Sequence, residues 1–186
     1  MVTTTDTTEI ITQPKTEIVT RPCLKRWLKH FFYLPATKRF FNAQDQHAIA
    51  KAVTAAEQGH VGEIQVVIEG CLPSRLAYAV DTHTRARQLF AELGVWDTEL
   101  NSGVLLYLNL CERKVEIVID RGIKTATTQQ VWDEVCAHIV QGLAQQQYRQ
   151  AVITGVKEIG EILDGFYDRQ LLDQQNELGN APIILG

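Results

Sequence analysis

Apolar residues recur every three to four positions in some segments and form short β-branched runs in others, so helices and strands can be assigned from the pattern. The alanine-rich segment 42–60 predicts a helix that ends at Gly59. The run GEIQVVIEG, residues 62–70, predicts a buried strand between two glycines. Apolar spacing then predicts a second helix from Ser74, its expected N-cap, to about Leu93.

Residues 95–122, VWDTELNSGVLLYLNLCERKVEIVIDRG, predict a β-hairpin. With the turn at CERK, residues 111–114, facing positions have numbers that add up to about 225. One face is then almost wholly apolar and pairs Val104, Leu106, Leu108 and Leu110 with Arg121, Ile119, Ile117 and Val115. The other face is mixed and pairs Leu105, Tyr107 and Asn109 with Asp120, Val118 and Glu116. This register brings Asp120 back to the base of the hairpin, beside the loop 97–103.

Two further helices are expected after the hairpin, one from near Thr128 and one over YRQAVITGVKEIGEIL, residues 148–163. The predicted order is helix, strand, helix, two strands and two helices, which is typical of a layered α/β protein with a mixed sheet. A helix joins strands 62–70 and 103–110, so a right-handed crossover is expected between them. We interpret residues 42–165 as one α/β domain.

The segments that flank this domain differ from it in composition. Residues 1–20 are rich in Thr and are interpreted as a disordered tail. Residues 166–186 form a polar C-terminal extension, and its apolar motif PIIL is expected to dock on the domain or on another molecule. Residues 21–41 contain no acid and interleave basic with aromatic side chains.

The basic and aromatic segment 21–41 predicts a short amphipathic helix that Pro35 stops. Its apolar residues at helical spacing are Leu24, Trp27, Leu28, Phe31 and Phe32. The favoured interpretation is that this helix docks its aromatic face on the domain and leaves its lysines in solvent, because such helices are common in soluble proteins. The alternative is that residues 21–34 contact an anionic membrane surface or a membrane-associated protein partner.

Bulk composition excludes several classes of protein. The apolar fraction of 45% is that of an ordinary globular domain, and the net charge of −4 argues against a nucleic-acid binder. No apolar run approaches the ~20 residues that span a bilayer, and the N-terminus lacks the pattern of a secretory signal peptide. We therefore expect a cytoplasmic protein, or one held peripherally at the inner membrane. The four cysteines are far apart, so we expect reduced thiols and no zinc site.

Several separated motifs resemble the TPM domain family, which is named after a thylakoid-lumen protein, a photosystem II repair protein and a modulator of acetylcholine receptors. They are VWDTELNSGVLLYL, KVEIVIDRGI, VWDEVC and AVITGVKEIGEIL, and HVGEIQVVIEGCLP fits them as well. The resemblance runs from about residue 26 to 165 and is strongest to a short bacterial branch without signal peptide. It departs at DGFYD, where that branch has a segment like His-Phe-Pro.

The resemblance implies a Rossmann-like α/β sandwich, with a small sheet covered by helices on both sides. It implies functions that differ among members, which are described as phosphatases, as calcium-binding proteins or as accessory factors of membrane complexes. Members outside the cytoplasm carry a Gly-rich loop and an acid after the hairpin. Here that region is DRGIKTATTQQ, with no acid before Asp133, and only Asn101 and Gly103 match that part of the pattern.

The candidate chemistry lies in the oxygen-bearing side chains of DTELNSG and at the end of the hairpin. Asp97, Glu99 and Asn101, with Asp120 from across the hairpin base, offer hard oxygen ligands suited to Ca²⁺ or Mg²⁺. The simpler interpretation is that these side chains satisfy nearby backbone N–H groups, as Asp and Asn often do in turns. A third interpretation is a metal-dependent phosphatase that uses the same four residues.

No motif of a known catalytic class is present, so we expect a non-enzymatic binding or accessory module, with a protein partner and a divalent cation at the loop 97–103 as candidate ligands. Trp96 and Trp132 lie beside periodic apolar positions and are expected in the core. His47, His60 and His83 are expected at helix surfaces or ends, in solvent.

Overall fold

The computed structural model of the chain describes residues 8–9, 22–33, 37–124, 127–167 and 176–186. The described residues form one five-stranded mixed sheet in the order β1-β4-β3-β2-β5. The strands are β1 Thr8–Glu9, β2 Glu63–Glu69, β3 Gly103–Asn109, β4 Lys114–Ile119 and β5 Ile183–Leu185. The helices are α1 Leu24–Phe31, α2 Thr37–Phe40, α3 Ala43–Ala56, α4 Ser74–Ala79, α5 Thr82–Glu92, α6 Arg121–Lys124, α7 Gln129–Ala144 and α8 Tyr148–Asp164.

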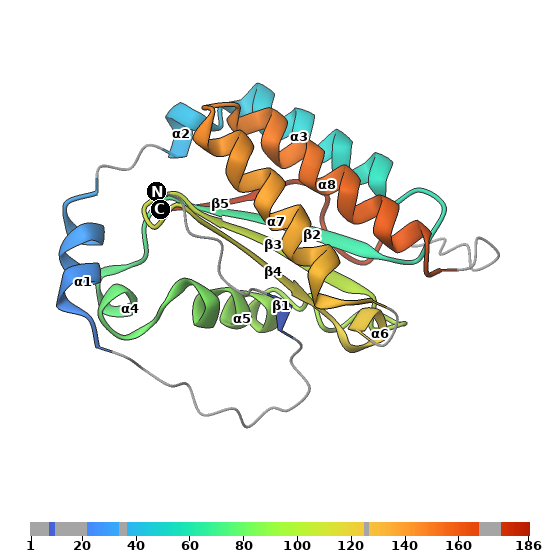
Figure 1. The fold of residues 1–186 in the computed structure, drawn as a ribbon, viewed down its shortest axis with the longest axis horizontal. Helices are drawn as coiled ribbons and strands as arrows, with labels where there is room; N and C mark the ends of the chain where they lie inside the picture. Colours follow the sequence, from blue (N-terminus) through green and yellow to red (C-terminus); the bar gives the residue numbers. More distant parts are fainter. Residues whose placement is uncertain (1–7, 10–21, 34–36, 125–126, 168–175) are drawn as a thin grey trace.

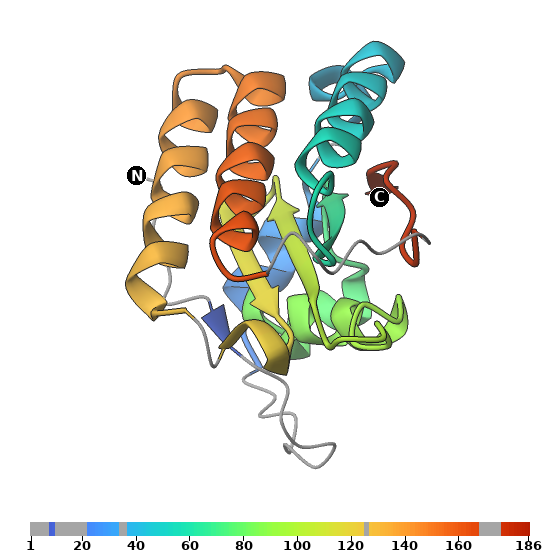
Figure 2. The same cartoon turned by 90° about the vertical axis from the view of Figure 1, so that its right-hand side faces the viewer.

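Helices cover both faces of the sheet, which confirms the expected α/β sandwich. Helices α3, α7 and α8 lie on one face and α5 lies on the other (Figures 1 and 2). The even-numbered side chains of β3 and the odd-numbered ones of β4 form the apolar face toward α3, α7 and α8. Leu105, Tyr107 and Val118 face α5. The expected division of the hairpin into an apolar and a mixed face is therefore confirmed.

Trp132 and Trp96 have opposite environments. Trp132 is 1% exposed in the main core, as expected, and its indole N–H donates to the hydroxyl of Thr127. Trp96 is 53% exposed and donates its indole N–H to the carbonyl of Ala91. The expectation that Trp96 lies in the core is wrong, because the turn after α5 points it outward.

The hairpin register differs by two positions from the expected one. Leu105 pairs with Val118, and Asn109 pairs with Lys114, so that facing numbers add to 223. The turn is residues 110–113, one position earlier than CERK, because Arg113 adopts the left-handed backbone conformation with φ of 57°. A shift by two leaves each side chain on its predicted face.

The long helix expected from Ser74 to Leu93 is two helices, α4 and α5. Asp81 lies between them in an extended conformation, and its carboxylate accepts a hydrogen bond from the backbone N–H of Thr84 at 2.8 Å. Asp81 is therefore the N-cap of α5. Ser74, the expected N-cap, is the first residue of α4 and has no capping role.

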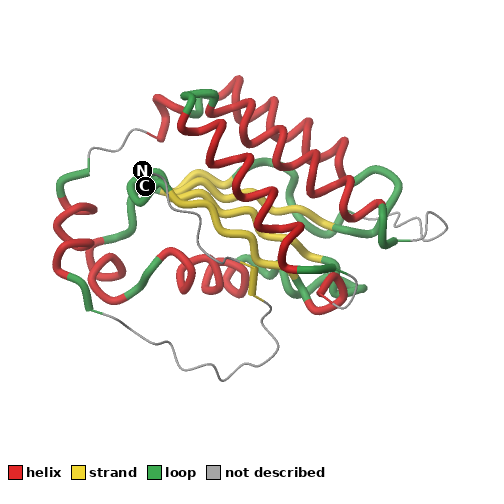
Figure 3. The backbone as a smooth tube through the Cα atoms, viewed as in Figure 1, coloured by secondary structure: helices red, strands yellow, loops and turns green. Residues whose placement is uncertain are grey.

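Two strands come from the segments outside the predicted domain. β1 lies in the 1–20 segment and pairs in parallel with β4, so these two residues are not a free tail, and the rest of that segment is outside the described residues. β5 lies in the C-terminal extension and pairs in parallel with β2, as expected for a docked PIIL motif (Figure 3). Among the described residues, none of the helices has the length and apolar character that crossing a bilayer requires.

Candidate functional site

The acidic loop, residues 97–103, connects α5 to β3 and is held by hydrogen bonds. The backbone N–H of Ser102 donates to the hydroxyl of Thr98 at 2.8 Å, and both of these residues are buried. The side chains of Asp97 and Glu99 are exposed to solvent. The hydroxyls of Thr98 and Ser102 and the carboxylate of Glu177, which accepts the N–H of Glu99 at 3.1 Å, hold the loop, and none of these was a candidate residue.

Asp120 lies beside the acidic loop, as the hairpin predicted, through its backbone. Its N–H donates to the carbonyl of Gly103 at 2.9 Å, and the N–H of Gly122 donates to the carbonyl of Asn101 at 3.0 Å. The carboxylate of Asp120 is buried, and its Oδ1 accepts the N–H of Arg121 at 2.6 Å. Burial raises the pKa of this carboxyl.

The three acidic candidates, Asp97, Glu99 and Asp120, do not come together as a set of ligands. A Ca²⁺ ion with ligand distances of about 2.4 Å needs its oxygens within roughly 5 Å of one another. Within the described part of the chain, no set of three His, Cys, Asp or Glu side chains that includes Asp97, Glu99 or Asp120 brings its ligand atoms within 4.8 Å of one another. Asn101 has a φ of 53°, and its backbone carbonyl accepts the N–H of Gly122 at the base of the hairpin. The carboxylate of Asp120 accepts a local backbone N–H, as the simpler interpretation predicts, whereas Asp97 and Glu99 are exposed, and the acidic candidates give no support to an assembled cation or phosphatase site.

A group of buried polar side chains lies next to Asp120 and was not predicted. His60, expected in solvent, is 5% exposed, and its Nδ1 accepts the backbone N–H of Gly62 at 2.9 Å. The rings of His60 and Tyr167 have centroids 6.5 Å apart. Burial lowers the pKa of His60, and burial together with the charge of Asp120 raises the pKa of Tyr167 to about 12. Both side chains are therefore neutral near pH 7.

The opposite end of the sheet carries a cavity of about 870 Å³, which we call the hairpin-tip pocket. It lies at the β3–β4 turn, where parallel strands β2 and β3 end, and open α/β sheets bind ligands at such ends. Its described lining residues come from α1, α2, the β3–β4 hairpin and the α7–α8 connection: Lys29, Tyr33, Phe40, Leu108–Lys114, Leu143, Ala144, Gln146 and Tyr148.

The polar groups in the wall of this pocket are largely engaged with one another. The amide of Asn109 donates to the hydroxyl of Tyr107 at 2.9 Å and accepts the backbone N–H of Glu112 at 2.8 Å. The carboxylate of Glu112 lies 3.1 Å from Nε2 of His30 and 3.5 Å from Nζ of Lys29. His30 and Lys29 lower the pKa of Glu112, so this carboxylate is ionised near neutral pH.

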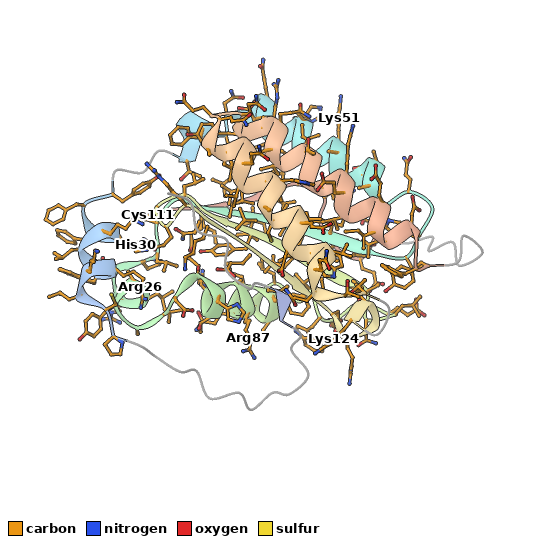
Figure 4. All side chains as sticks on the ribbon, in the orientation of Figure 1. Arg26, His30, Lys51, Arg87, Cys111 and Lys124 are labelled. Carbon is orange, nitrogen blue, oxygen red and sulfur yellow. The ribbon has the colours of Figure 1, made fainter. Side chains whose placement is uncertain are left out.

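His30, Cys111 and Glu112 have side-chain ligand atoms within 4.8 Å of one another, which is a spacing that can suit a metal. Figure 4 labels His30 and Cys111 of this group. However, Nδ1 of His30 accepts the backbone N–H of Leu72 at 3.0 Å, so the neutral ring carries its proton on Nε2. A metal ligand needs a lone pair on that nitrogen and a protonated Nδ1. We therefore interpret the group as a histidine–carboxylate pair in close contact beside a buried thiol.

Helix α1 is attached to the domain through its polar side. Nε of Arg26 donates to the carbonyl of Ala77 at 2.8 Å, and the buried His30 binds the end of β2. The favoured orientation, with the aromatic face on the domain, is wrong, because Arg26 and His30 occupy the docking side. The apolar side chains that face solvent are Leu24, Leu28, Phe31 and Phe32, with exposed fractions of 62%, 41%, 57% and 73%.

The face of the sheet under α5 contains a buried polar cluster. The hydroxyl of Tyr107 donates to Glu69 at 2.6 Å, and Arg85 lies 3.4 Å from the same carboxylate. Burial raises the pKa of Tyr107 well above its ordinary value. The cluster connects α5 to β2 and β3, and we interpret it as structural.

Comparison with known proteins agrees with this architecture. The model of the TPM domain matches residues 36–162. The BA42 protein of the psychrophilic bacterium Bizionia argentinensis, solved by NMR, has 27% sequence identity and a TM-score of 0.69, over 78% of this chain and 95% of that protein. No curated protein matches. Since the family model covers more than half of the chain, the protein belongs to the TPM domain family.

Proposed function

We propose that this TPM domain protein is a non-enzymatic accessory module that docks on an anionic membrane surface through α1. The observation that supports the proposal is the outward orientation of the apolar side of α1. Large apolar side chains are exposed at eight positions of the described residues, and four of these lie within residues 24–32. A monomeric soluble domain rarely gathers exposed apolar side chains in this way without a binding role.

The sequence of α1 suits an interfacial helix. Leu24, Leu28, Phe31 and Phe32 follow at spacings of four, three and one, which places them on one side of the helix. Lys25 and Lys29 flank this side and are exposed. A helix with Phe and Leu on one face and Lys beside them binds in the plane of an anionic bilayer. Charge complementarity therefore favours lipid over a protein partner.

The expected affinity is weak and reversible. Completing the burial of four partly exposed Leu and Phe side chains contributes about 1 kcal/mol each. Two lysines near an anionic surface add about 1 kcal/mol each. The total of about 6 kcal/mol corresponds to a dissociation constant on the order of tens of micromolar. Such binding suits an accessory protein that exchanges between the surface and solution.

The rigid attachment of α1 supports docking without a conformational change. The backbone N–H of Cys23 donates to the carbonyl of Tyr78 at 2.9 Å, next to the hydrogen bond from Arg26 to Ala77. The rings of Trp27 and Phe31 stack with centroids 5.1 Å apart. The apolar face is thus held in place before contact, which reduces the entropy lost on binding.

Vesicle flotation tests the proposal. We expect the protein to float with vesicles that contain phosphatidylglycerol and to float poorly with pure phosphatidylcholine. The double variant F31S/F32S should lose most of the binding, and W96S/L100S, which removes exposed apolar side chains elsewhere, should retain it. Absence of flotation with anionic vesicles would contradict the proposal. The exposed apolar face of α1 would then be expected to bind a protein partner.

A further inference from the structure

The hairpin-tip pocket is a cavity that membrane docking through α1 does not use. Its volume of about 870 Å³ is in the range of small-molecule sites. Much of its wall is apolar: Phe40, Leu108, Leu110, Leu143, Ala144 and Tyr148. Four of these, Phe40, Leu110, Leu143 and Tyr148, are only partly buried, although they pack against the main core. The cavity therefore leaves apolar surface that a ligand can cover.

The buried polar groups of the pocket are engaged within the protein. Both functions of the Asn109 amide are used within the protein, by Tyr107 and by the backbone of Glu112. The carboxylate of Glu112 is engaged by His30 and Lys29. Burial raises the pKa of Cys111 to about 11, so its thiol is uncharged. The buried part of a ligand would thus meet mainly hydrocarbon.

The edge of the pocket is positively charged. Arg113 is exposed in the β3–β4 turn, Lys114 is half-buried at the start of β4, and neither forms an ion pair with another described residue. Lys29 lies on the same edge and shares Glu112 with His30. Three cations against one carboxylate leave an excess of positive charge beside an apolar cavity. This combination is complementary to a molecule with an apolar body and one anionic group.

We propose that the hairpin-tip pocket binds an anionic amphiphile with a single acyl chain. The chain lies among Phe40, Leu110, Leu143 and Tyr148, and the carboxylate or phosphate head lies at Arg113 and Lys114. This site shares Lys29 with the membrane-docking side of α1 but none of its exposed Leu and Phe side chains, so it goes beyond membrane docking and stands without it. A carboxylate head would come from a free fatty acid, and a phosphate head from a lysophospholipid.

Calorimetric titration with decanoate and with decyl phosphate, each below its micelle concentration, tests the proposal on the full chain. We expect saturable binding of one molecule per chain, with decanol much weaker because it has no charge. R113Q/K114Q should weaken binding about tenfold. The loss of one exposed ion pair weakens binding about threefold, and the effects of the two losses multiply. The tighter of the two anions identifies the source of the ligand.

Two matched comparisons locate the binding. A144W places a large side chain at an exposed position of the pocket wall and should abolish binding, whereas A55W, at an exposed position of α3, should not. K51Q/K124Q removes two exposed cations that lie away from Cys111 and should leave the affinity unchanged (Figure 4). Circular dichroism confirms that each variant is folded. Lack of saturable binding, equal affinity for decanol, or unchanged affinity in A144W would overturn the proposal.

Discussion

Nδ1 of His30 accepts a hydrogen bond from the backbone N–H of Leu72 at 3.0 Å, which connects α1 to the chain directly after β2. Nε2 of the same ring lies 3.1 Å from the carboxylate of Glu112 in the β3–β4 turn. One side chain of α1 thus contacts the ends of two neighbouring strands. The apolar face of α1 is turned to solvent because this polar side is the docked one.

Replacing His30 should release α1 from the sheet. In H30A the buried N–H of Leu72 loses its partner and the carboxylate of Glu112 keeps only Lys29, which should cost about 2 kcal/mol. Hydrogen exchange followed by mass spectrometry should then show faster exchange across residues 24–31. H47A removes an exposed histidine from α3 and is the matched control, with no expected change. Equal protection of α1 in H30A and the native chain would contradict the role of His30.

Glu57 should make stability decrease as pH rises. Burial and the nearby charge of Glu63 raise its pKa from 4.5 to about 8, although the N–H of Ile64 donates to it. The folded state keeps a proton that the unfolded chain loses above about pH 4.5, so stability falls between about pH 5 and pH 8. E57Q keeps an oxygen for Ile64 but cannot ionise. Urea unfolding should give E57Q and the native chain the same free energy of unfolding at pH 5. At pH 8.5 the free energy of unfolding of E57Q should be higher by about 2 kcal/mol.

The exposed acid Glu161 on α8 provides the control for this pH effect. E161Q should follow the native pH profile, because the side chain of Glu161 is exposed to solvent in the folded state as it is in the unfolded chain. If E57Q also followed the native profile, the buried proton on Glu57 would be excluded.

Calcium should not stabilise the protein through the acidic loop. A site with a dissociation constant of 0.1 mM would add about 2.7 kcal/mol at 10 mM Ca²⁺ and raise the melting temperature by several degrees. Because Asp97, Glu99 and Asp120 do not converge, we expect no such shift in the native chain or in D97N/D120N. A shift in the native chain that the double variant lacks would instead establish the cation site.

Arg113 allows stability and ligand binding to be separated. Its φ of 57° costs a non-glycine residue about 1 kcal/mol, so R113G should raise the free energy of unfolding by up to that amount. The same substitution removes a cation from the hairpin-tip pocket and should weaken decanoate binding. N101G, at a φ of 53°, should gain less, because Asn tolerates this conformation better. A loss of stability in R113G would contradict the backbone argument.

The sequence predicted the elements whose pattern is local and missed the relationships that depend on distant residues. Period-two and helical spacing located β2, β3, α3, α7 and α8. The predicted hairpin register was wrong by two positions because CERK and LCER are equally weak turn sequences. Nothing in them indicates that Arg113 adopts the left-handed backbone conformation. The break at Asp81 had a local signal, an Asx N-cap before Thr82, that apolar periodicity overrode.

The candidate site was harder to predict than the fold. The approach of Asp120 to the acidic loop followed from the hairpin, but the outward direction of Asp97 and Glu99 did not. The orientation of α1 depends on a contact between His30 and Leu72, 42 positions apart, which no periodicity in residues 21–41 contains. The hairpin-tip pocket joins residues from four separate segments and has no sequence motif of its own.

The most direct test of membrane docking is paramagnetic attenuation of backbone amide signals on phosphatidylglycerol-containing nanodiscs that carry a spin-labelled lipid. If the protein docks through α1, we expect strong attenuation of the amide signals of Leu24, Leu28, Phe31 and Phe32. We expect little attenuation at Trp96 and Leu100, which are exposed to a similar degree on another part of the surface. Attenuation centred on another surface, or none at any amide, would contradict docking through α1.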